Sequence, residues 1–289
     1  MAVNCCVVPD AIDGLVGVTA IDDSTAPFFP AVTLSLPLIP VEAILIPAFE
    51  ETWLLGRRVG AAQARGYTLS ALADVHRLAG DLDSALDAAQ RAVNAFAEAE
   101  DAAGLALALN HLGCVERDRR LFDPADQHLR EALRLRKQLG DRRGENLSLA
   151  NLGLLSAAAG QLDEGRRLGR MALDRGEAVG DEPGVAGALL DLAVVELFGG
   201  ERQPARLLAE RAAEAFHPQG YPRLEAWPLL LAAELAHESG DRDAVIKHGG
   251  AATELFGRAG CRIGLARAAA LPLGNRRPRR ARTSPAKAR

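Results

Sequence analysis

The chain has 289 residues, and its abundant Ala, Leu, Arg, Asp and Glu, with only 4% aromatic residues, favour helices over strands. Four cysteines are too few for a disulfide framework and lack zinc-ligand spacing, which indicates a reducing, cytoplasmic setting (Cys5, Cys6, Cys114 and Cys261). The net charge of −4 divides into +7 for residues 275–289 and −11 for residues 1–274, so a nucleic-acid-binding face on the acidic body is disfavoured.

Residues 1–46 are predicted to form an irregular, proline-rich leader outside any repeat. Six prolines lie between Pro9 and Pro47, among runs rich in Val and Ile. The absence of a basic n-region argues against a secretory signal. Residues 31–49 are apolar enough to raise a membrane question, but three prolines and Glu42 interrupt them, so we expect no membrane contact.

A helical pattern begins near residue 47, and residues 48–60 are predicted to be the second helix of a degenerate half-repeat. From there a forty-residue period runs along the chain. Glycines repeat in one phase (Gly80, Gly160, Gly200, Gly240) with Arg120 in the missing slot, and half a period later in another (Gly140, Gly180, Gly220, Gly260). Leucines and alanines keep the same period (Leu72, Leu112, Leu152, Leu192; Ala92, Ala132, Ala172, Ala212, Ala252). Such phasing indicates tandem repeats.

Each unit is predicted to be a pair of helices. In residues 103–140 the first helix has apolar residues at helical spacing, and the second ends at Gly140. We expect Asp123 to cap the second helix, with Pro124 at its first position. Gly-Asp pairs at the other joints are expected to close one helix in the left-handed conformation and cap the next.

Small residues recur where the two helices of a pair should meet. They follow the repeated leucine in each first helix (Ala73, Gly113, Gly153, Ala193), and a matching set lies in each second helix (Ala85, Ala125, Gly165, Ala205). A larger side chain at these positions would hold the helices apart. Because one pair cannot bury its apolar face alone, the units are expected to stack.

These positions resemble the tetratricopeptide repeat family. The resemblance rests on Asn151-Leu152-Gly153 and its counterparts at residues 111–113 and 191–193, with the small residues and alanines that follow, and it covers residues 67–270. The forty-residue length is similar to the variant in kinesin light chains and in the C-terminal arms of MalT-like and SARP-type bacterial regulators. The resemblance implies a right-handed α-solenoid of about five helix-turn-helix repeats over residues 47–272. HEAT-like repeats share the period and are the alternative.

Residues 263–271 are predicted to form a C-terminal capping helix that Pro272 ends. Residues 273–289 are predicted to be a basic, disordered tail, whose seven cations are the one feature that could contact nucleic acid.

Catalytic and cofactor motifs are absent from the sequence. It has no Gly-rich loop ending in Gly-Lys-Ser/Thr, no Gly-x-Ser-x-Gly and no His-Glu-x-x-His. Glu234 and His237 with His248 make half of a carboxylate metal site, but solvated surface charge is the simpler interpretation. We therefore expect no enzyme activity, no cofactor and no metal.

The family resemblance implies that the first helix of each pair lines a concave peptide-binding groove. The predicted groove residues are Asn110, His111, Cys114, Arg117, Leu147, Asn151, Leu154, Leu190, Asp191 and Val194. Asn110 and Asn151 could clamp an extended peptide backbone, since an amide both donates and accepts hydrogen bonds. The alternative is that each Asn bonds only its neighbouring helix. An apolar stripe on repeats three and four indicates a partner, a self-contact in a homo-oligomer, or burial by tight curling.

The sequence thus predicts a cytoplasmic interaction scaffold that holds a peptide or protein segment, in one form as the sensory arm of a bacterial transcriptional regulator. Two alternatives stay open: a DNA-associated regulator that uses its basic tail, and a non-functional truncated remnant.

Overall fold

A computed structural model describes residues 61–272 except 79 and 221, and all its regular elements in that range are helical. The leader, the half-repeat at 48–60 and the basic tail lie outside the described residues. The elements are α2 (Ala61–Leu78), α3 (Leu82–Glu98), α4 (Ala102–Asp118), α5 (Phe122–Leu139), α6 (Arg142–Ala158), α7 (Leu162–Val179), α8 (Glu182–Phe198), α9 (Arg202–Phe216), η2 (His217–Gln219), α10 (Pro222–Glu238), α11 (Arg242–Arg258) and α12 (Arg262–Ala269).

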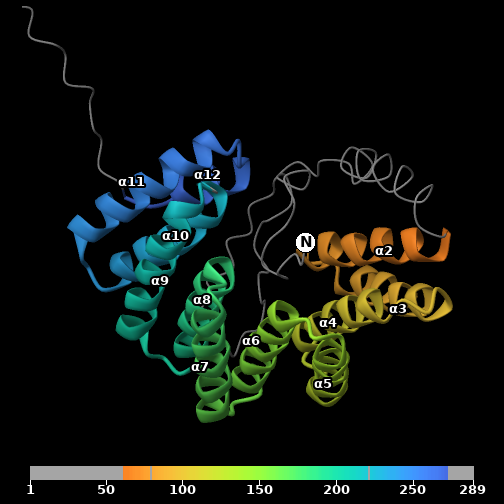
Figure 1. Cartoon of the computed structure of the whole chain (residues 1–289). Helices are drawn as coiled ribbons and strands as arrows, with labels where there is room; N and C mark the ends of the chain where they lie inside the picture. The colour runs from red at the N-terminus through yellow and green to blue at the C-terminus, as the bar shows by residue number, and fades with distance from the viewer. Residues whose placement is uncertain (1–60, 79, 221, 273–289) are drawn as a thin grey trace, which may run out of the picture.

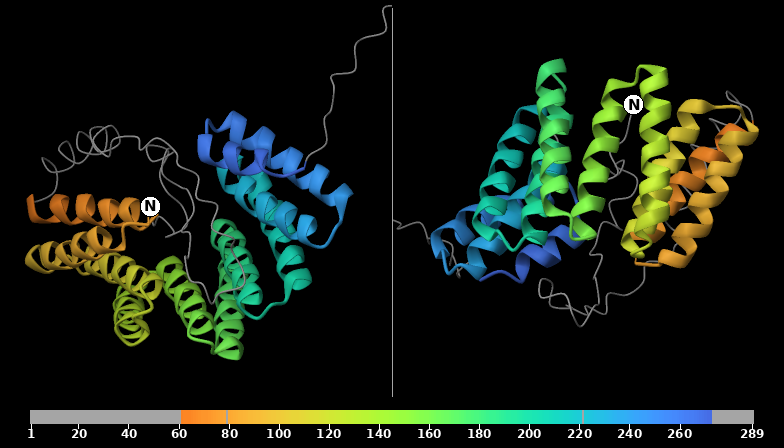
Figure 2. Two further views of the ribbon diagram at one scale, coloured as in Figure 1. Left: turned by 180° about the vertical axis from the view of Figure 1, so that it is seen from behind. Right: turned by 90° about the horizontal axis from the view of Figure 1, so that it is seen from below.

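The helices pack as five consecutive antiparallel pairs, from α2/α3 to α10/α11, and α12 covers the last pair. The pairs stack into an arch, with α2 at one end and α10 to α12 at the other (Figures 1 and 2). The predicted all-α solenoid of five units with a terminal capping helix is confirmed. The capping helix ends at Ala269, three residues before Pro272.

The joints between helices follow the predicted glycine chemistry. Glycines of both phases have positive φ, and Arg120 adopts the same left-handed conformation at φ 61° in the slot without glycine. The predicted cap at Asp181 does not form, because its side chain makes no cap hydrogen bond to α8. Asp81, Asp141 and Asp241 each accept a hydrogen bond from a backbone N–H of the helix that they precede. These bonds satisfy donors that helix geometry leaves unpaired.

The predicted cap at Asp123 is wrong. Helix α5 begins at Phe122, and its N-cap residue is Leu121, which makes no side-chain cap hydrogen bond. Arg120 ends the preceding turn in the left-handed conformation, so α5 starts earlier than the Asp-Pro pair indicated. Asp123 lies instead in the first turn of α5, where the helix dipole favours an acidic side chain.

Small residues allow the paired helices to approach closely, as predicted. A Cβ on Gly165 would lie 2.9 Å from the backbone oxygen of Gly153, and a Cβ on Gly153 would lie 3.1 Å from that of Gly165. The backbones of α6 and α7 are therefore in direct contact at this point. Ala73, Ala85, Ala125, Ala193 and Ala205 are fully buried at the equivalent positions of other pairs.

Aromatic rings fill equivalent slots at the two ends of the array. In repeat one, Phe96 is buried against Tyr67 with ring centroids 4.9 Å apart, and in repeat five Phe256 packs on Trp227 at the same separation. Glycine makes room for each ring, because a Cβ on Gly104 or Gly264 would overlap it. In repeat two the residue forty positions after Phe96 is Arg136, which lies against Gly144 in the corresponding slot.

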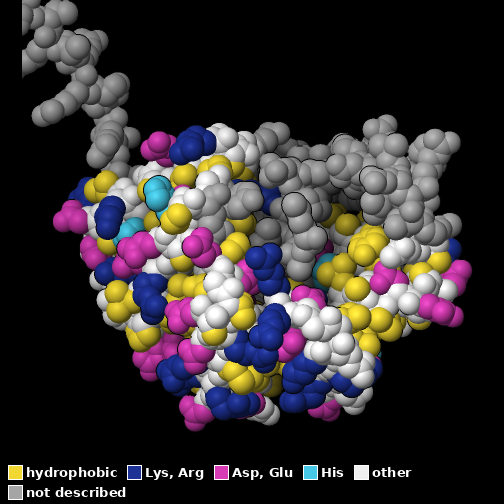
Figure 3. Space-filling model, in the orientation of Figure 1, with side chains coloured by type: hydrophobic (Ala, Val, Ile, Leu, Met, Phe, Trp, Pro, Cys, Tyr) yellow, Lys and Arg dark blue, Asp and Glu magenta, His cyan; other side chains and the backbone are white. Residues whose placement is uncertain are grey.

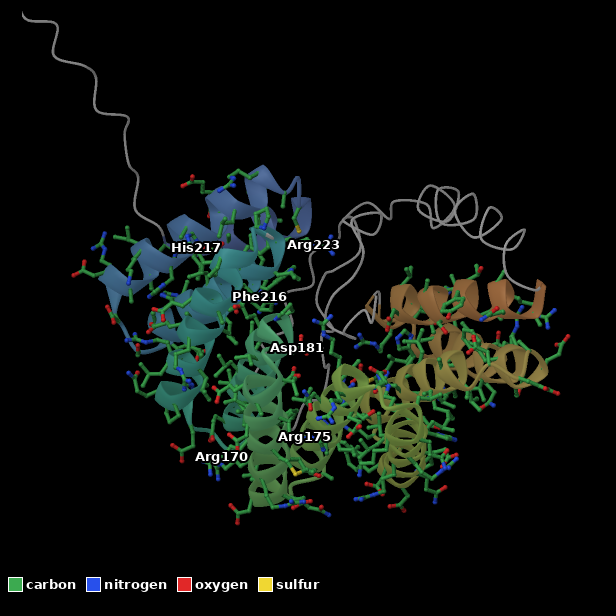
Figure 4. All side chains as sticks on the ribbon, in the orientation of Figure 1. Arg170, Arg175, Asp181, Phe216, His217 and Arg223 are labelled. Carbon is green, nitrogen blue, oxygen red and sulfur yellow. The ribbon has the colours of Figure 1, made fainter. Side chains whose placement is uncertain are left out.

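Ion pairs connect neighbouring repeats. Arg166 of α7 donates to Glu196 of α8 at 2.7 Å, and Arg206 of α9 donates to Asp241, which precedes α11, at 2.8 Å. Within repeat three, Arg175 of α7 donates to Glu145 of α6 (Figure 4 labels Arg175). Because these side chains are partly exposed and solvent screens their charges, the pairs contribute little, and the apolar interfaces supply most of the stability.

Candidate interaction face

The first helices of the pairs, α2, α4, α6, α8 and α10, lie toward the hollow of the arch, while α5 and α7 lie on its outer side (Figure 1). These first helices turn one surface toward the hollow, and we call that surface the concave face. The ten predicted groove residues all belong to α4, α6 and α8. The helical period places them in a row along each helix, so that residues of successive repeats become neighbours across the face.

A hydrogen-bonded layer crosses from α4 to α6 at the predicted clamp residues. The Asn151 side-chain amide donates to Asn110 Oδ1 at 3.2 Å, and Arg136 of α5 donates to the same oxygen at 3.2 Å. Arg136 also donates to the hydroxyl of Ser148 at 2.8 Å and to the carbonyl of Gly144 at 2.9 Å. Asn110, Asn151 and Arg136 are at most 4% exposed. The sequence left open that each Asn bonds only its neighbouring helix. The bond between Asn151 of α6 and Asn110 of α4 is such a bond.

His111 bridges α4 to α2. Its Nδ1 lies 3.2 Å from the carbonyl oxygen of Ser70 and 3.5 Å from a carboxylate oxygen of Asp74, and the residue is 6% exposed. Forty residues later, Asn151 makes the corresponding contact from α6 to α4. The same position in successive repeats thus carries a polar side chain that reaches back to the preceding first helix.

Arg117 belongs to a charged cluster at the C-terminal ends of α2 and α4. It donates to Asp118 at 2.8 Å, and Arg77 of α2 donates to the same carboxylate at 3.1 Å and to Asp74 at 3.4 Å. Burial alone would raise the pKa of Asp118, but attraction to Arg117 and Arg77 outweighs burial, so its pKa is lowered. Burial also opposes the charge on Arg117, but attraction to Asp118 outweighs burial, so the pKa of Arg117 is raised.

The remaining predicted residues are mostly apolar, and they change in exposure along the arch. Cys114, Leu147 and Leu154 are buried, as is Asp191. Leu190 and Val194 of α8 are partly exposed. The concave face is therefore polar and internally bonded at α2 and α4, mixed at α6, and apolar and more open at α8.

Sequence reasoning missed Arg136 and Asp118, which hold the polar half of this face together. A signal for Arg136 was available, because it occupies the repeat position of Phe96 and Phe256, where a buried aromatic residue is expected. Asp118 carried no such signal, since its role depends on Arg77, which lies forty-one residues earlier and meets it only when α2 packs beside α4.

The half metal site considered from the sequence does not assemble. Glu234 accepts hydrogen bonds from Arg267, and His248 lies 3.2 Å from Glu210 instead. Among the described residues, no group of three His, Cys, Asp or Glu side chains could hold a metal ion. Within the same residues, no helix combines the length and the apolar character needed to cross a membrane. Acidic and basic side chains alternate over the described part of the surface in Figure 3.

Residues 64–138 match a family model described as Tetratricopeptide repeat. The chain carries tetratricopeptide repeats. The match covers the first two helix pairs, and the remaining pairs of the tetratricopeptide array continue the same forty-residue period and the same packing. Proteins built from such repeats are interaction scaffolds, and the fold of this chain is of that type. A comparison with curated protein sequences gives no match.

Solved structures share the fold of this tetratricopeptide array at low sequence identity. A Rap protein complexed with competence and sporulation factor has a TM-score of 0.64 and 12% identity, covering 81% of this chain and 63% of that chain. BtubC (BKLC) from P. vanneervenii has a TM-score of 0.51 and 17% identity, covering 75% of this chain and 90% of that chain. The chain therefore spans less than two thirds of the length of the Rap protein.

Proposed function

We propose that the tetratricopeptide array binds a peptide or an extended protein segment along its concave face, with contacts from α4, α6 and α8. In one form of this proposal, inferred from the sequence, the array is the sensory arm of a transcriptional regulator. The structure of a Rap protein complexed with competence and sporulation factor supports it by showing a similar fold in complex with a factor.

One observation carries the proposal: the positions that build the fold repeat, whereas those on the concave face do not. The packing positions hold Leu or a small residue in each of the first four units. By contrast, the concave position of Asn110 is Ala150 in repeat three and Leu190 in repeat four, and that of Cys114 becomes Leu154 and Val194. Burial accounts for the residues of repeats two and three at these positions, but not for the apolar side chains of repeat four, which are partly exposed. Individual side chains on a shared frame are what selective recognition requires.

The chemistry of the face indicates an extended ligand with a polar part and an apolar part. Because Asn110 and Asn151 are buried and bonded to each other, the polar groups that a ligand meets at α4 are the partly exposed Arg117 and Asp118. The partly exposed Leu190 and Val194 of α8 offer apolar contacts. A ligand that lies across the first helices would meet these two parts in succession.

The proposal is tested by affinity capture with the full chain as bait, followed by mass spectrometry. Replacing Asn151 and Leu154 together by Ala should reduce capture of the partner, because it removes the bond from Asn151 to Asn110 and the buried packing of Leu154, which together shape the face. Since both residues are buried, a second variant, Leu190→Ala with Val194→Ala, changes partly exposed positions at less cost to packing.

The matched control is Leu207→Ala with Arg211→Ala, on exposed positions of the second helix α9. It should capture the partner as well as the natural chain does. All variants are compared by far-ultraviolet circular dichroism, so that loss of fold is separated from loss of contact. Undiminished capture by both concave-face variants would refute the assignment to this face.

A further inference from the structure

An apolar strip runs along α8 on the concave face. It consists of Leu190, Val194, Leu197 and Phe198, which we call the α8 strip. Their spacing of four, three and one residues places them on one side of the helix. Phe198 is 46% exposed, and the other three are partly exposed. Leu197 and Val194 rest on the buried clusters beneath them, so the strip is held in place from below.

The equivalent positions in repeat two show that the fold does not require apolar residues here. They are Asn110, Cys114, Arg117 and Asp118, three of which are polar or charged. Helix α8 also has an apolar residue at nearly every position other than Glu182, Asp191 and Glu196, whereas the helices of the outer side alternate apolar and charged residues. Exposure of such an apolar strip to water is unfavourable, and open strips of this kind are typical contact surfaces.

The same chain contains a segment whose composition matches the strip. Residues 31–49 carry a single charged side chain, Glu42, within nineteen residues rich in Leu, Ile and Val. Three prolines, Pro37, Pro40 and Pro47, prevent a continuous helix and favour an extended backbone in the residues before them. Contact between such a segment and a row of exposed apolar side chains removes both surfaces from water.

The segment is long enough and close enough in the chain to reach α8. The α8 strip lies in a helix of 17 residues, about 25 Å long, which about eight residues of extended chain would cover. Eleven residues separate Phe49 from the first residue of α2 and span about 17 Å as the helix predicted above, and the nineteen residues of the segment in extended form span up to about 60 Å more. Helix α8 is the third first helix after α2, at roughly 10 Å per step and so about 30 Å away. Covalent attachment gives such a contact an effective concentration in the millimolar range.

We propose that residues 31–49 dock in extended form on the α8 strip of the same chain and compete there with an external ligand. The docking itself does not depend on the proposed function, whereas the competition rests on it. Apolar side chains of the segment cover Val194 and Phe198, and a partner reaches the apolar half of the concave face only when the segment is displaced. The leader is then a built-in competitor that lowers the apparent affinity of the face.

Photo-cross-linking in the full-length chain tests the docking with no partner present. A benzoylphenylalanine probe replaces Val194, and a control probe replaces Leu207, which is 50% exposed on α9. Digestion after glutamate, which cuts at Glu42 and Glu50, divides the target segment for mass spectrometry. The probe at position 194 should form cross-links within one chain to residues 31–49, and the probe at position 207 should not.

Charged substitutions in the segment complete the test. Leu38→Asp with Ile39→Asp should lower the yield of cross-links from position 194 by about tenfold, since docking would bury two carboxylates against apolar side chains. Val7→Asp with Val8→Asp, outside the segment, should leave the yield unchanged. The proposal is overturned if position 194 links only to residues beyond 31–49, only to a second copy of the chain, or not at all. Because the assay contains no partner, its failure leaves the capture experiment on Asn151 and Leu154 intact.

Discussion

At the scale of single residues, the most informative positions are those where a side chain departs from the repeat. Arg136 occupies the slot that Phe96 and Phe256 fill in the terminal repeats, and its guanidinium is satisfied by Asn110, Ser148 and the carbonyl of Gly144. A buried cation costs free energy unless its donors are bonded. The polar residues around Arg136 are therefore as much a requirement of the fold as a feature of the concave face.

Asp118 supports a prediction on pH. Its folded-state pKa is lowered by Arg117 and Arg77, below the value of about 3.9 expected in the unfolded chain. The carboxylate therefore stabilises the fold above about pH 4, and this contribution disappears as the pH falls through the folded-state pKa. Asp118→Asn should lower the free energy of unfolding by about 1–3 kcal/mol at pH 7. The difference from the natural chain should shrink below about pH 4, as measured by urea unfolding at several pH values.

Glu131→Gln is the control for this measurement. Glu131 is hydrogen-bonded to Arg134 on the outer helix α5, where both side chains are exposed, so its removal should change stability by less than about 0.5 kcal/mol. A difference for Asp118→Asn that stays constant down to pH 3 would contradict the assigned role of the carboxylate.

At the scale of elements, the packing of each helix pair depends on how closely its two backbones approach. Gly153, Gly165 and Gly169 bring α6 and α7 together, and the space next to Gly169 is filled by Leu192 from α8. Glycine lowers helix stability by about 0.5–1 kcal/mol relative to Ala when no tertiary contact is affected. At these positions the cost is offset by the close packing that the absence of a side chain permits.

Gly165→Ala and Gly250→Ala should therefore change stability in opposite directions. At Gly165 the added Cβ would lie 2.9 Å from a backbone oxygen, which cannot rotate away, so a loss of about 1–3 kcal/mol is expected. At Gly250, in the interior of α11, nothing lies within 4 Å, so a gain of about 0.5–1 kcal/mol is expected. Thermal and urea unfolding followed by circular dichroism measure both. A gain for Gly165→Ala would show that α6 and α7 are not held in backbone contact.

At the scale of the whole molecule, stability is distributed along a line. The main contacts join helices that follow one another in the chain or first helices of adjacent repeats. No single core joins the two ends of the described part of the arch, and the buried clusters follow one another from repeat to repeat. In such an array, stability is approximately a sum of terms for each repeat and for each interface between neighbours.

A local change should then have a local effect on hydrogen exchange. Gly165→Ala is expected to speed amide exchange chiefly in α6, α7 and α8, with smaller changes in α2, α3 and α11. Mass spectrometry of peptic fragments resolves these helices. Equal acceleration in all of them would mean that the array opens as one cooperative unit.

The sequence by itself determined the repeat, the pairing of helices and the positions of closest approach. These depend on local periodicity, on glycine at the joints and on residues forty positions apart, all of which can be read without coordinates. The predicted start of α5 was two residues too late. Arg120 in the left-handed conformation ends the preceding turn before the Asp-Pro pair is reached. Its position in the glycine slot of the period, unlike its side chain, indicates that conformation.

Only the tertiary structure decided how the side chains of the concave face are used. The sequence placed Asn110 and Asn151 on first helices, but not their bond to each other and to Arg136, which forms where α4, α5 and α6 meet. It likewise placed Val194 and Leu190 in a row, but not that they stay partly exposed while Leu154 is buried. Spacing along the chain fixes which face of a helix a residue occupies. What that face meets depends on the angle at which successive pairs stack, and that angle comes from packing across many residues.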